Sequence, residues 1–496
     1  MKKNLSIFGY LLNSNVDQNL VALKQGNITI THREFIDLIK KVADRLSSLN
    51  IKKGDVVTIS LPNIIEGILS FYAVNAVGAI ANMVHPSLPN FKLLEIQEST
   101  HSKLLIGLHS QKATGLKIVC DKKDVENSWT NFISKKATPI KYNMEDSTSV
   151  YLHSGGTTDN PKTIVLSSKQ FNGVAIGLKG LFKNGETTGF KALTVLPMFH
   201  GFGLAAGMHA TLCLGMELIL VPKFDKSTTP AMIINEKINM ILGVPIIYEA
   251  ILAHPVIQNA TDLSSLKYCF VGGDKTPMDL LSRFNAMLKK KNSNAKLCEG
   301  YGLTECVSVC AVNRNDKYRI GSIGLPIDNV TLGILSAENT FLESESIGEI
   351  CISGDTVMDR YLSYDISDCF MEKDGKVWLK TGDYGYRDSE GYYYFVERKK
   401  RIVKISGVTV FPSEVELILR TNYNVSNVFV KQISKTNPRL KAFVVLKKDA
   451  YVSAEELIEY CSAHLMKWAV PEQIVFLDAL PMTPIGKIDK KNKIFD

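Results

Sequence analysis

A run of glycines, hydroxyls and one lysine occupies residues 154–162 and reads Ser154-Gly155-Gly156-Thr157-Thr158-Asp159-Asn160-Pro161-Lys162. Two adjacent glycines allow the backbone to bend so that several N–H groups point at one anion. The hydroxyls add donors and the lysine adds positive charge, so the segment suits a polyphosphate. The same composition is also typical of a surface turn, and the Gly-x4-Gly-Lys-Ser/Thr spacing of a Walker A loop is absent.

A second segment places glycines around an aromatic ring and reads Glu299-Gly300-Tyr301-Gly302-Leu303-Thr304-Glu305. Such a segment offers a flat surface on which a planar ring can lie. Thr304 and Glu305 follow directly after this segment, where their side chains could reach the phosphate of a bound nucleotide and its Mg²⁺, a cation that prefers oxygen ligands. Taken alone, a glutamate such as Glu305 is more often a surface or capping acid.

Two shorter segments carry one notable side chain each. Asp383, in Thr381-Gly382-Asp383, has the chemistry to accept hydrogen bonds from a ribose diol, although a turn aspartate is the simpler interpretation. Lys487 ends Pro481-Met482-Thr483-Pro484-Ile485-Gly486-Lys487, where an isolated lysine is usually solvated.

The elements expected around these segments alternate between helices and strands. Residues 31–49 have apolar side chains at helical spacing behind a Thr and a Glu three positions later, the pattern of a capping box. We expect strands at 55–61 and 103–106 and a helix at 64–81. Similar strands are expected at 192–196, 217–221, 240–244 and 268–271. This alternation predicts an α/β fold of βαβ units around a mostly parallel sheet.

The pattern changes after residue 321, where short strands separated by Gly, Asp and Asn turns predict a small β-rich subdomain over residues 321–397. A basic cluster, Arg398-Lys399-Lys400-Arg401, follows. The chain beyond it is long enough for a small α+β domain. The sequence therefore predicts a large N-terminal domain over residues 1–397 and a small, mobile C-terminal domain over residues 398–496.

The composition limits the class of protein. The chain has 496 residues, 45% hydrophobic and 22% charged, which excludes a disordered, collagen-like or coiled-coil protein. A net charge of +8 without dense Lys/Arg stripes argues against nucleic-acid binding. Nine scattered cysteines predict neither a zinc site nor disulfides and suit a reducing cytoplasm. No apolar run is long enough to span a membrane, and residues 5–12 are expected to form a short helix rather than a signal peptide.

Together, in this order, the segments resemble the adenylate-forming (AMP-binding) superfamily, which contains acyl- and aryl-CoA synthetases, luciferases and adenylation domains of nonribosomal peptide synthetases. The resemblance extends over residues 23–490 and is closest to the acyl/aryl-CoA ligases. It implies a two-step reaction with ATP and Mg²⁺: a carboxylate attacks the α-phosphate to give an acyl-adenylate, and a thiol, usually of coenzyme A, then displaces AMP.

The resemblance also implies roles for individual residues. Lys487 matches the catalytic lysine of the first step, and Thr304 and His200 are further expected catalytic residues. Ser154, Gly155, Gly156, Thr157, Thr158 and Lys162 match the pyrophosphate loop, with Thr157 and Glu305 as metal ligands. Glu299, Gly300, Tyr301 and Gly302 match the adenine contact, and Asp383 and Arg398 the ribose contacts. Lys400 matches the hinge, and Lys404 and Gly407 the segment used in thioester formation.

The phosphate loop departs from the family pattern. Asp159 and Thr163 stand where the family usually has glycine. A further carboxylate beside a triphosphate is unfavourable unless it faces solvent or reaches the metal. We therefore expect a higher ATP KM or a slower first step than with glycine, which an Asp159→Gly variant tests.

The acid pocket is expected near Pro197-Met198-Phe199-His200-Gly201-Phe202-Gly203-Leu204, with His200 near the substrate carboxylate. Amino-acid-activating relatives usually have an Asp here, and none occurs between Met198 and Met208. Gly272 and Gly273, which match another pocket segment, leave room for an aryl ring or a short or medium acyl chain. Tyr248, Cys306 and Val307 are candidates for either pocket lining or core packing.

These observations predict a carboxylate–CoA ligase acting on a small-molecule acid. One alternative is a stand-alone adenylating enzyme that loads a separate acyl carrier protein. Another is a non-catalytic nucleotide- or acyl-binding relative, which the Asp159 substitution allows and the joint presence of Lys487, Glu305 and Asp383 disfavours.

Overall fold

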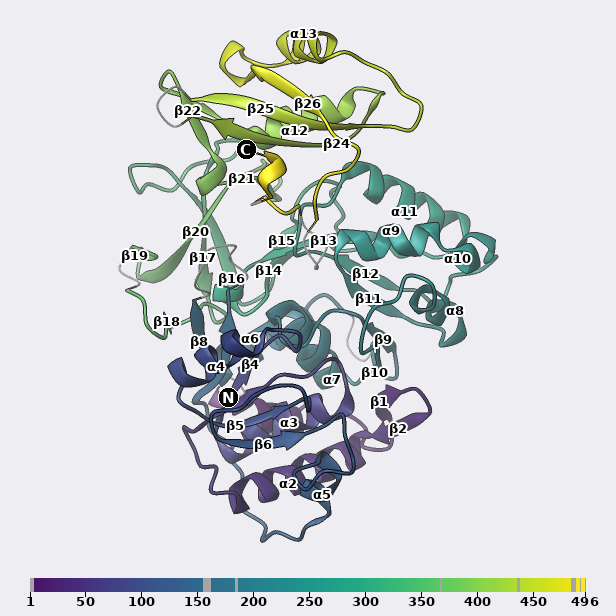
Figure 1. Cartoon of the computed structure of the whole chain (residues 1–496), viewed down its shortest axis with the longest axis vertical. Coiled ribbons are helices and arrows are strands. Elements are labelled where there is room, and N and C mark those ends of the chain that lie inside the picture. Colours follow the sequence, from purple (N-terminus) through teal and green to yellow (C-terminus); the bar gives the residue numbers. More distant parts are fainter. Residues whose placement is uncertain are drawn as a thin grey trace. The chain divides into compact units, whose positions relative to one another are not determined.

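The computed structural model describes residues 4–154, 162–182, 186–365, 368–434, 438–482, 488–490 and 492–495. Its helices and strands alternate along the first half of the chain, and the last third is mainly strands (Figure 1). The expected α/β class, with a large N-terminal domain and a smaller C-terminal domain, is confirmed.

A nine-stranded sheet carries most of the candidate site. Its order is β15 (Leu325–Pro326), β14 (Val309–Val312), β13 (Leu297–Gly302), β12 (Tyr268–Val271), β11 (Met240–Gly243), β9 (Lys191–Thr194), β10 (Glu217–Leu220), β1 (Val21–Gln25) and β2 (Ile28–Thr31). Neighbours from β13 to β1 pair in parallel, whereas β14 pairs antiparallel with β13. The strands expected at 192–196, 217–221, 240–244 and 268–271 are therefore adjacent members of one sheet.

Three helices cover one side of this sheet. They are α9 (Pro245–Ala253), α10 (Pro255–Asn259) and α11 (Met278–Lys290), and they lie beside β11 and β12 in Figure 1. Tyr248 and Phe284 from these helices pack edge to face, with ring centroids 5.0 Å apart. The Tyr248 hydroxyl donates to the carbonyls of Ile241 and Phe270. Tyr248 is thus a core residue that fixes the helices to the sheet.

A seven-stranded sheet carries the phosphate-loop segment. Its order is β18 (Arg360–Tyr361), β8 (Thr163–Ser167), β7 (Thr148–His153), β4 (Ile80–Met83), β3 (Val56–Ile59), β5 (Ser102–Gly107) and β6 (Leu116–Val119). The helix α2 (His32–Ser48) has the expected capping box, in which Thr31 and Glu34 satisfy each other's backbone N–H groups.

The helix expected at 64–81 is shorter in the structure. Helix α3 (Ile65–Val77) ends at Gly78, which has φ 87° and caps the helix in the left-handed conformation. The following residues form β4, so the prediction was wrong from residue 78 onward. Almost all of α3 is buried, and its continuous apolar sequence runs without a break into the strand.

The remaining helices of the described chain are short or lie between strands. They are α1 (Ile7–Leu12), α4 (Asn90–Ser99), α5 (Trp129–Ser134), α6 (Ser168–Lys179), α7 (Thr211–Cys213), α8 (Met232–Asn235), α12 (Pro412–Thr421) and α13 (Ala454–His464). The segment Phe202–Ala210 is π-helical. Helix α1 is the short first helix expected at residues 5–12. No helix within the described ranges combines the length and the apolar character that crossing a membrane requires.

Three further sheets follow along the chain. The first contains β16 (Val330–Leu335), β17 (Gly348–Gly354), β20 (Lys376–Arg387) and β19 (Phe370–Lys373), with β21 (Tyr393–Arg398) paired to β20. The second is the hairpin β22 (Val403–Ile405) and β23 (Val408–Val410), and the third contains β24 (Val425–Ile433), β25 (Arg439–Leu446) and β26 (Gln473–Phe476).

Compactness divides the chain into two units. The first comprises Met1–Leu332 and Ile352–Leu379, and the second comprises Gly333–Cys351 and Lys380–Asp496. The boundary expected between residues 397 and 398 falls inside the second unit.

Candidate active site

The two ends of the predicted phosphate loop are tied together in the first unit. Ser154 follows β7 and Lys162 precedes β8, and the Ser154 N–H donates to the Lys162 carbonyl at 2.9 Å. The Lys162 N–H in turn donates to Ser154 Oγ at 3.0 Å. The candidates Gly155, Gly156, Thr157 and Thr158, together with Asp159, lie outside the described residues.

A partly buried histidine supports the base of this loop. Asn82 donates its amide hydrogens to Thr58 and Thr100, so its Oδ1 accepts a hydrogen bond from His153 Nε2 at 2.7 Å. His153 Nδ1 then accepts from the Thr163 hydroxyl at 3.2 Å. Burial lowers the pKa of His153 to about 4, so the ring is neutral at pH 7. Thr163, which replaces a family glycine, therefore has a partner that glycine could not bind.

Lys162 lies against two aromatic rings. Its Nζ is 4.6 Å from the centre of the Tyr361 ring and 5.1 Å from that of Tyr364. Cation–π contacts of this kind stabilise the charged ammonium and restrict its position. Tyr361 also donates its hydroxyl to Glu305 Oε1 at 2.9 Å. The structure thus connects Lys162 and Glu305, two residues predicted separately, through a tyrosine that the sequence analysis missed.

Glu305 has the chemistry of a magnesium ligand. Its Oε1 accepts from Tyr361, and Oε2 has no hydrogen-bond partner among the described residues. Mg²⁺ is usually held by one or two carboxylates together with substrate phosphates and water. No group of three or more His, Cys, Asp or Glu side chains suited to a metal occurs within the described part of the chain. A single carboxylate completed by phosphate oxygens is the arrangement that these residues fit.

The segment around Glu305 has an unusual backbone. Thr304–Cys306 form one 3-10 turn, and Val307 follows with φ 64° and ψ −53°. The Ser308 N–H donates to the Cys306 carbonyl at 2.6 Å, which closes a γ-turn with positive φ, a strained conformation for a β-branched residue. Val307 is fully buried.

Two glycines make room for this turn. A Cβ on Gly201 would overlap the Val307 carbonyl oxygen, and a Cβ on Gly302 would overlap that of Ser308. Gly302 belongs to the predicted adenine segment, and Gly201 follows His200. The backbone of the acid-pocket segment is therefore in direct contact with the turn that carries Glu305.

The other residues of the predicted adenine segment lie on β13. Tyr301 is buried, and Glu299 Oε2 accepts a hydrogen bond from the Gly321 N–H at 3.1 Å. Burial raises the pKa of Glu299 to about 7, against the opposing effects of the Gly321 N–H and of Lys275.

The predicted pocket glycines, Gly272 and Gly273, follow β12. A Cβ on Gly272 would lie 3.0 Å from the Gly300 carbonyl and 3.4 Å from the Phe202 ring. The space expected beside Gly272 is therefore occupied by Phe202. Gly273 has φ 78°, a left-handed backbone conformation that favours glycine.

His200 is exposed at the start of the π-helical segment. Its Nδ1 accepts from the Phe202 N–H at 3.5 Å. Turns of π-helix are rare and occur frequently at functional sites.

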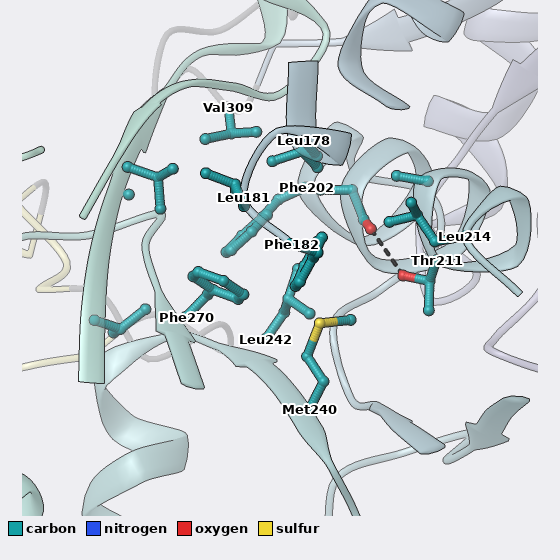
Figure 2. Close-up of a pocket in the computed structure, with 15 residues that line it drawn as sticks. Leu178, Leu181, Phe182, Phe202, Thr211, Leu214, Met240, Leu242, Phe270 and Val309 are labelled. Carbon is teal, nitrogen blue, oxygen red and sulfur yellow. Dashed lines mark hydrogen bonds between the residues drawn. The ribbon is translucent and has the colours of Figure 1, made fainter. Parts of the chain in front are cut away.

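An apolar cavity lies between this π-helical segment and the sheet (Figure 2). Its enclosed volume is small, about 30 Å³. Phe202 and Ala206 line it from the helix, Leu242 and Phe270 from β11 and β12, and Gly300 from β13. Tyr248, Cys306 and Val307 are not among its lining residues. Leu178, Leu181 and Phe182 also line it, and no motif in the sequence marked them for this role.

The ribose candidates lie in the second unit. Asp383 on β20 and Arg398 on β21 are cross-strand partners, and Arg398 Nε is 3.3 Å from Asp383 Oδ1. The Asp383 side chain is only 6% exposed, whereas that of Arg398 is 67% exposed. The arginine therefore holds a buried carboxylate in place while most of its own donors face outward.

The basic cluster and the predicted thioester segment are also in the second unit. Lys400 is exposed in a 3-10 turn between β21 and β22, and its neighbour Arg401 pairs with Glu397 and Glu416. Lys404 is exposed on β22, and Gly407 has φ 81° in the turn of the β22–β23 hairpin. Lys487 lies outside the described residues.

Buried thiols lie on β12, on β13 and in the turn after Glu305. Burial raises the pKa of Cys298, on β13, to about 12. It also raises the pKa values of Cys269 and Cys306 well above the ordinary thiol value. These side chains are protonated at neutral pH.

Comparison with known proteins identifies the family. The AMP-binding enzyme family matches residues 13–362, and the AMP-binding enzyme C-terminal domain matches residues 414–487. A long-chain-fatty-acid–CoA ligase of Bacillus subtilis is 30% identical, with 92% of this chain and 88% of that protein covered. A 4-coumarate–CoA ligase 1 of Petroselinum crispum is 29% identical, with 94% and 88% covered.

Among solved structures, o-succinylbenzoate CoA synthetase from Bacillus subtilis, in complex with its acyl-adenylate intermediate, superimposes with a TM-score of 0.82. It is 25% identical, and the match covers 98% of both chains. The family match spans most of the chain and agrees with the motifs seen in the sequence. The chain belongs to the AMP-binding enzyme family.

Proposed function

We propose that this protein is an ATP-dependent carboxylate–CoA ligase. The observation that carries the proposal is the position of β13: Gly300 lines the apolar cavity, and the same strand continues into Tyr301 and the turn bearing Glu305. One strand thus runs from the lining of the apolar cavity to the candidate nucleotide residues, which supports a site for both substrates around β13. Family membership and the CoA ligases among the relatives support the same activity.

In the first step, a carboxylate oxygen attacks the α-phosphorus of ATP, and the bond to pyrophosphate breaks. Two anions must be held in line, so positive charge and oriented donors are what this chain has to provide. We assign the phosphates to Ser154, Thr157, Thr158 and Lys162, and the acid carboxylate to His200 and Lys487. Bound Mg²⁺, held by Glu305 with Thr157, would neutralise charge on the triphosphate.

The nucleoside contacts are assigned from the family motif. We propose that Tyr301 and its neighbouring glycines hold adenine and that Asp383 accepts from the ribose hydroxyls with Arg398 beside it. In the second step, the thiol of coenzyme A attacks the acyl carbon and AMP leaves. We assign Lys404 and Gly407 to that step and Lys400 to a hinge about which residues 398–496 move, because these positions match the family's motif.

We also propose a cytoplasmic location. The nine cysteines are free, and no side-chain arrangement in the described structure pairs them as disulfides. Thiols in this number persist unpaired in a reducing compartment.

The decisive experiment is acid-dependent ATP–pyrophosphate exchange, followed by AMP release with and without coenzyme A. Lys487→Ala is expected to reduce exchange at least 100-fold, while Lys490→Ala, an exposed neighbour, serves as the matched control. Saturation by coenzyme A alone supports the ligase. Turnover only with an added acyl carrier protein would replace it by the carrier-loading alternative, and nucleotide binding without exchange for any acid would identify a non-catalytic relative.

A further inference from the structure

Glu349 on β17 is a buried carboxylate that no motif in the sequence marked. Its side chain is only 10% exposed. Its Oε1 accepts a hydrogen bond from the Gly382 N–H at 2.9 Å, and its Oε2 accepts one from Lys399 Nζ at 3.1 Å. A carboxylate removed from water destabilises the fold unless it is paired, and each oxygen of Glu349 has a partner. The side chain therefore has one defined position between two donors.

Both partners of Glu349 are immediate neighbours of the ribose candidates. Gly382 directly precedes Asp383 on β20, and Lys399 directly follows Arg398 at the end of β21. Strand β20 pairs with both β17 and β21 (Figure 1). Asp383 and Arg398 are cross-strand partners and form an ion pair. One carboxylate on the third strand thus contacts the residue next to each member of that pair.

The turn at Gly382 is held at two points by β17. Gly382 has φ 70°, a left-handed conformation that a regular strand does not have. The Thr381 hydroxyl accepts from the Asp383 N–H at 3.0 Å and donates to the Ile350 carbonyl at 2.7 Å. Ile350 follows Glu349, so adjacent residues of β17 bind the hydroxyl and the Gly382 N–H. These contacts determine the direction in which the Asp383 side chain leaves β20.

Lys399 gives Glu349 a second connection to the ribose candidates. It belongs to the basic cluster at residues 398–401, and the family motif assigns it no role. Its side chain is 59% exposed, and the hydrogen bond to Glu349 raises its pKa, so the lysine is charged at neutral pH. Because a half-exposed ion pair contributes little to stability, its main effect is to fix the chain next to Arg398.

We propose that Glu349 is a positioning residue for nucleotide recognition. Through Gly382 and Lys399 it holds Asp383 and Arg398 in the arrangement that binds the ribose. This inference rests on the proposed function, because the ribose contacts are assigned there. It adds a residue that acts only through the ion pair and not by touching the nucleotide.

Nucleotide affinities test the inference directly. Isothermal titration calorimetry gives the Kd values for ATP and for 2′-deoxyATP, which lacks one ribose hydroxyl. Glu349→Ala is expected to raise the Kd for ATP about five- to tenfold, the loss expected when a charged hydrogen bond is misaligned. The ratio of the Kd for 2′-deoxyATP to that for ATP is expected to fall about threefold, because the deoxynucleotide has less of this contact to lose. An unchanged ratio in Glu349→Ala would overturn the inference.

A double variant shows whether Glu349 acts through Asp383. Asp383→Ala alone removes the acceptor, so adding Glu349→Ala to it is expected to leave the Kd ratio unchanged. A residue that only stabilises the fold would lower the Tm and weaken the binding of both nucleotides equally, without changing their ratio. A further fall of the ratio in the double variant, as large as that in Glu349→Ala alone, would show that Glu349 acts independently and would contradict the proposal.

Smaller changes separate the two contacts of Glu349. Glu349→Gln keeps an acceptor for the Gly382 N–H, and Lys399→Met removes only the ion pair. Each is expected to lower the Kd ratio about twofold, less than Glu349→Ala. Lys448→Met, at an exposed position of the same unit, is the matched control and is expected to leave the ratio unchanged. If Glu349→Ala does not fold, as thermal denaturation would show, these two variants provide the test, and unchanged ratios in both would refute the positioning role.

The same measurements distinguish this inference from the ligase function. Binding is titrated without acid or coenzyme A, so the Kd ratios test Glu349 even if ATP–pyrophosphate exchange is absent with every acid, a result that would refute the ligase function. Equal affinity of the unmodified protein for ATP and 2′-deoxyATP would overturn the inference alone. Absence of ATP binding would refute both.

Discussion

The Tyr361 hydroxyl donates a 2.9 Å hydrogen bond to Oε1 of Glu305, although 56 residues separate the two along the chain. The Tyr361 ring also lies 4.6 Å from Nζ of Lys162. Desolvation and the nearby Glu305 carboxylate raise the pKa of Tyr361 well above its ordinary value, so the hydroxyl keeps its proton and remains a donor. One tyrosine thereby orients both the expected metal ligand and the lysine of the phosphate loop.

Replacement of Tyr361 by Phe keeps the ring beneath Lys162 and removes the donor to Glu305. A hydrogen bond to a charged group contributes about 1.5–3 kcal/mol, so kcat/KM for exchange is expected to fall at least tenfold. The half-saturating Mg²⁺ concentration is expected to rise, since Glu305 loses its fixed orientation. Tyr423→Phe, at an exposed position, is the control, and an unchanged Mg²⁺ titration in Tyr361→Phe would contradict the positioning role.

Gly201 is expected not to tolerate a methyl group. Ala at this position would overlap the Val307 carbonyl and displace the turn that carries Glu305. A displacement of about 1 Å can reduce a reaction rate on the order of 100-fold, so a comparable loss of kcat is expected, together with a lower Tm. Gly207→Ala adds a methyl in the same helical segment with only ordinary contacts, and its Tm is expected to match or exceed that of the unmodified protein. Similar activities in the two variants would argue against this coupling.

The buried Asp383 carboxylate makes a specific prediction about the sugar. Asp383→Ala is expected to raise the KM for ATP at least tenfold, because a charged acceptor for the ribose hydroxyls is lost. The preference for ATP over 2′-deoxyATP should shrink in the same variant. Asp478→Ala, at an exposed site, controls for the general effect of charge. A preserved preference would assign the ribose to other residues.

Stability is expected to fall in mild acid because His209 is buried without charge. Tyr72 donates to its Nδ1, and its Nε2 donates to Asn172, while Cys213 and Tyr10 also contact the ring. Desolvation lowers the pKa of His209 to about 3, below the unfolded value of about 6.5. The unfolded chain therefore binds a proton that the folded chain excludes, and stability is lost as the pH falls below about 6.5.

The size of this effect can be measured against a variant. Between pH 6.5 and 5, the free energy of unfolding is expected to fall about 1.1 kcal/mol per pH unit more steeply than in His209→Gln, because the unfolded histidine is only half protonated at pH 6.5. Glu299, whose raised pKa acts in the opposite direction, contributes equally to both proteins and cancels in the comparison. Chemical denaturation at several pH values provides the measurement, and parallel curves would show that His209 is not the group responsible.

Local signals predicted the elements well where the pattern was self-contained. The capping box at Thr31 and Glu34 identified α2, and short β-branched runs identified the central strands. The end of α3 was missed because the apolar sequence continues through Gly78 into β4, and a left-handed glycine cap has no other mark in a single sequence.

The candidate active site was predictable only in part, because its contacts join residues that are far apart in the sequence. Motif residues such as Glu305 and Asp383 could be named as candidates from their segments and the family resemblance, but the contact between Glu305 and Tyr361 depends on how distant strands pair. The cavity likewise draws Phe182 and Met240 from separate elements, and ordinary apolar residues give no sign of which void they line. Long-range packing, rather than local propensity, determined these features.

The protonated state of the buried thiols has a consequence for an enzyme of the proposed kind. An acyl-adenylate is an electrophile, and any thiolate nearby competes with coenzyme A for the acyl group. Cys298 lies on the strand that leads to the site and Cys306 directly follows Glu305, yet burial keeps both unreactive. For the proposed ligase, these cysteines are therefore expected to stay protonated thiols, which compete poorly with coenzyme A for the acyl group.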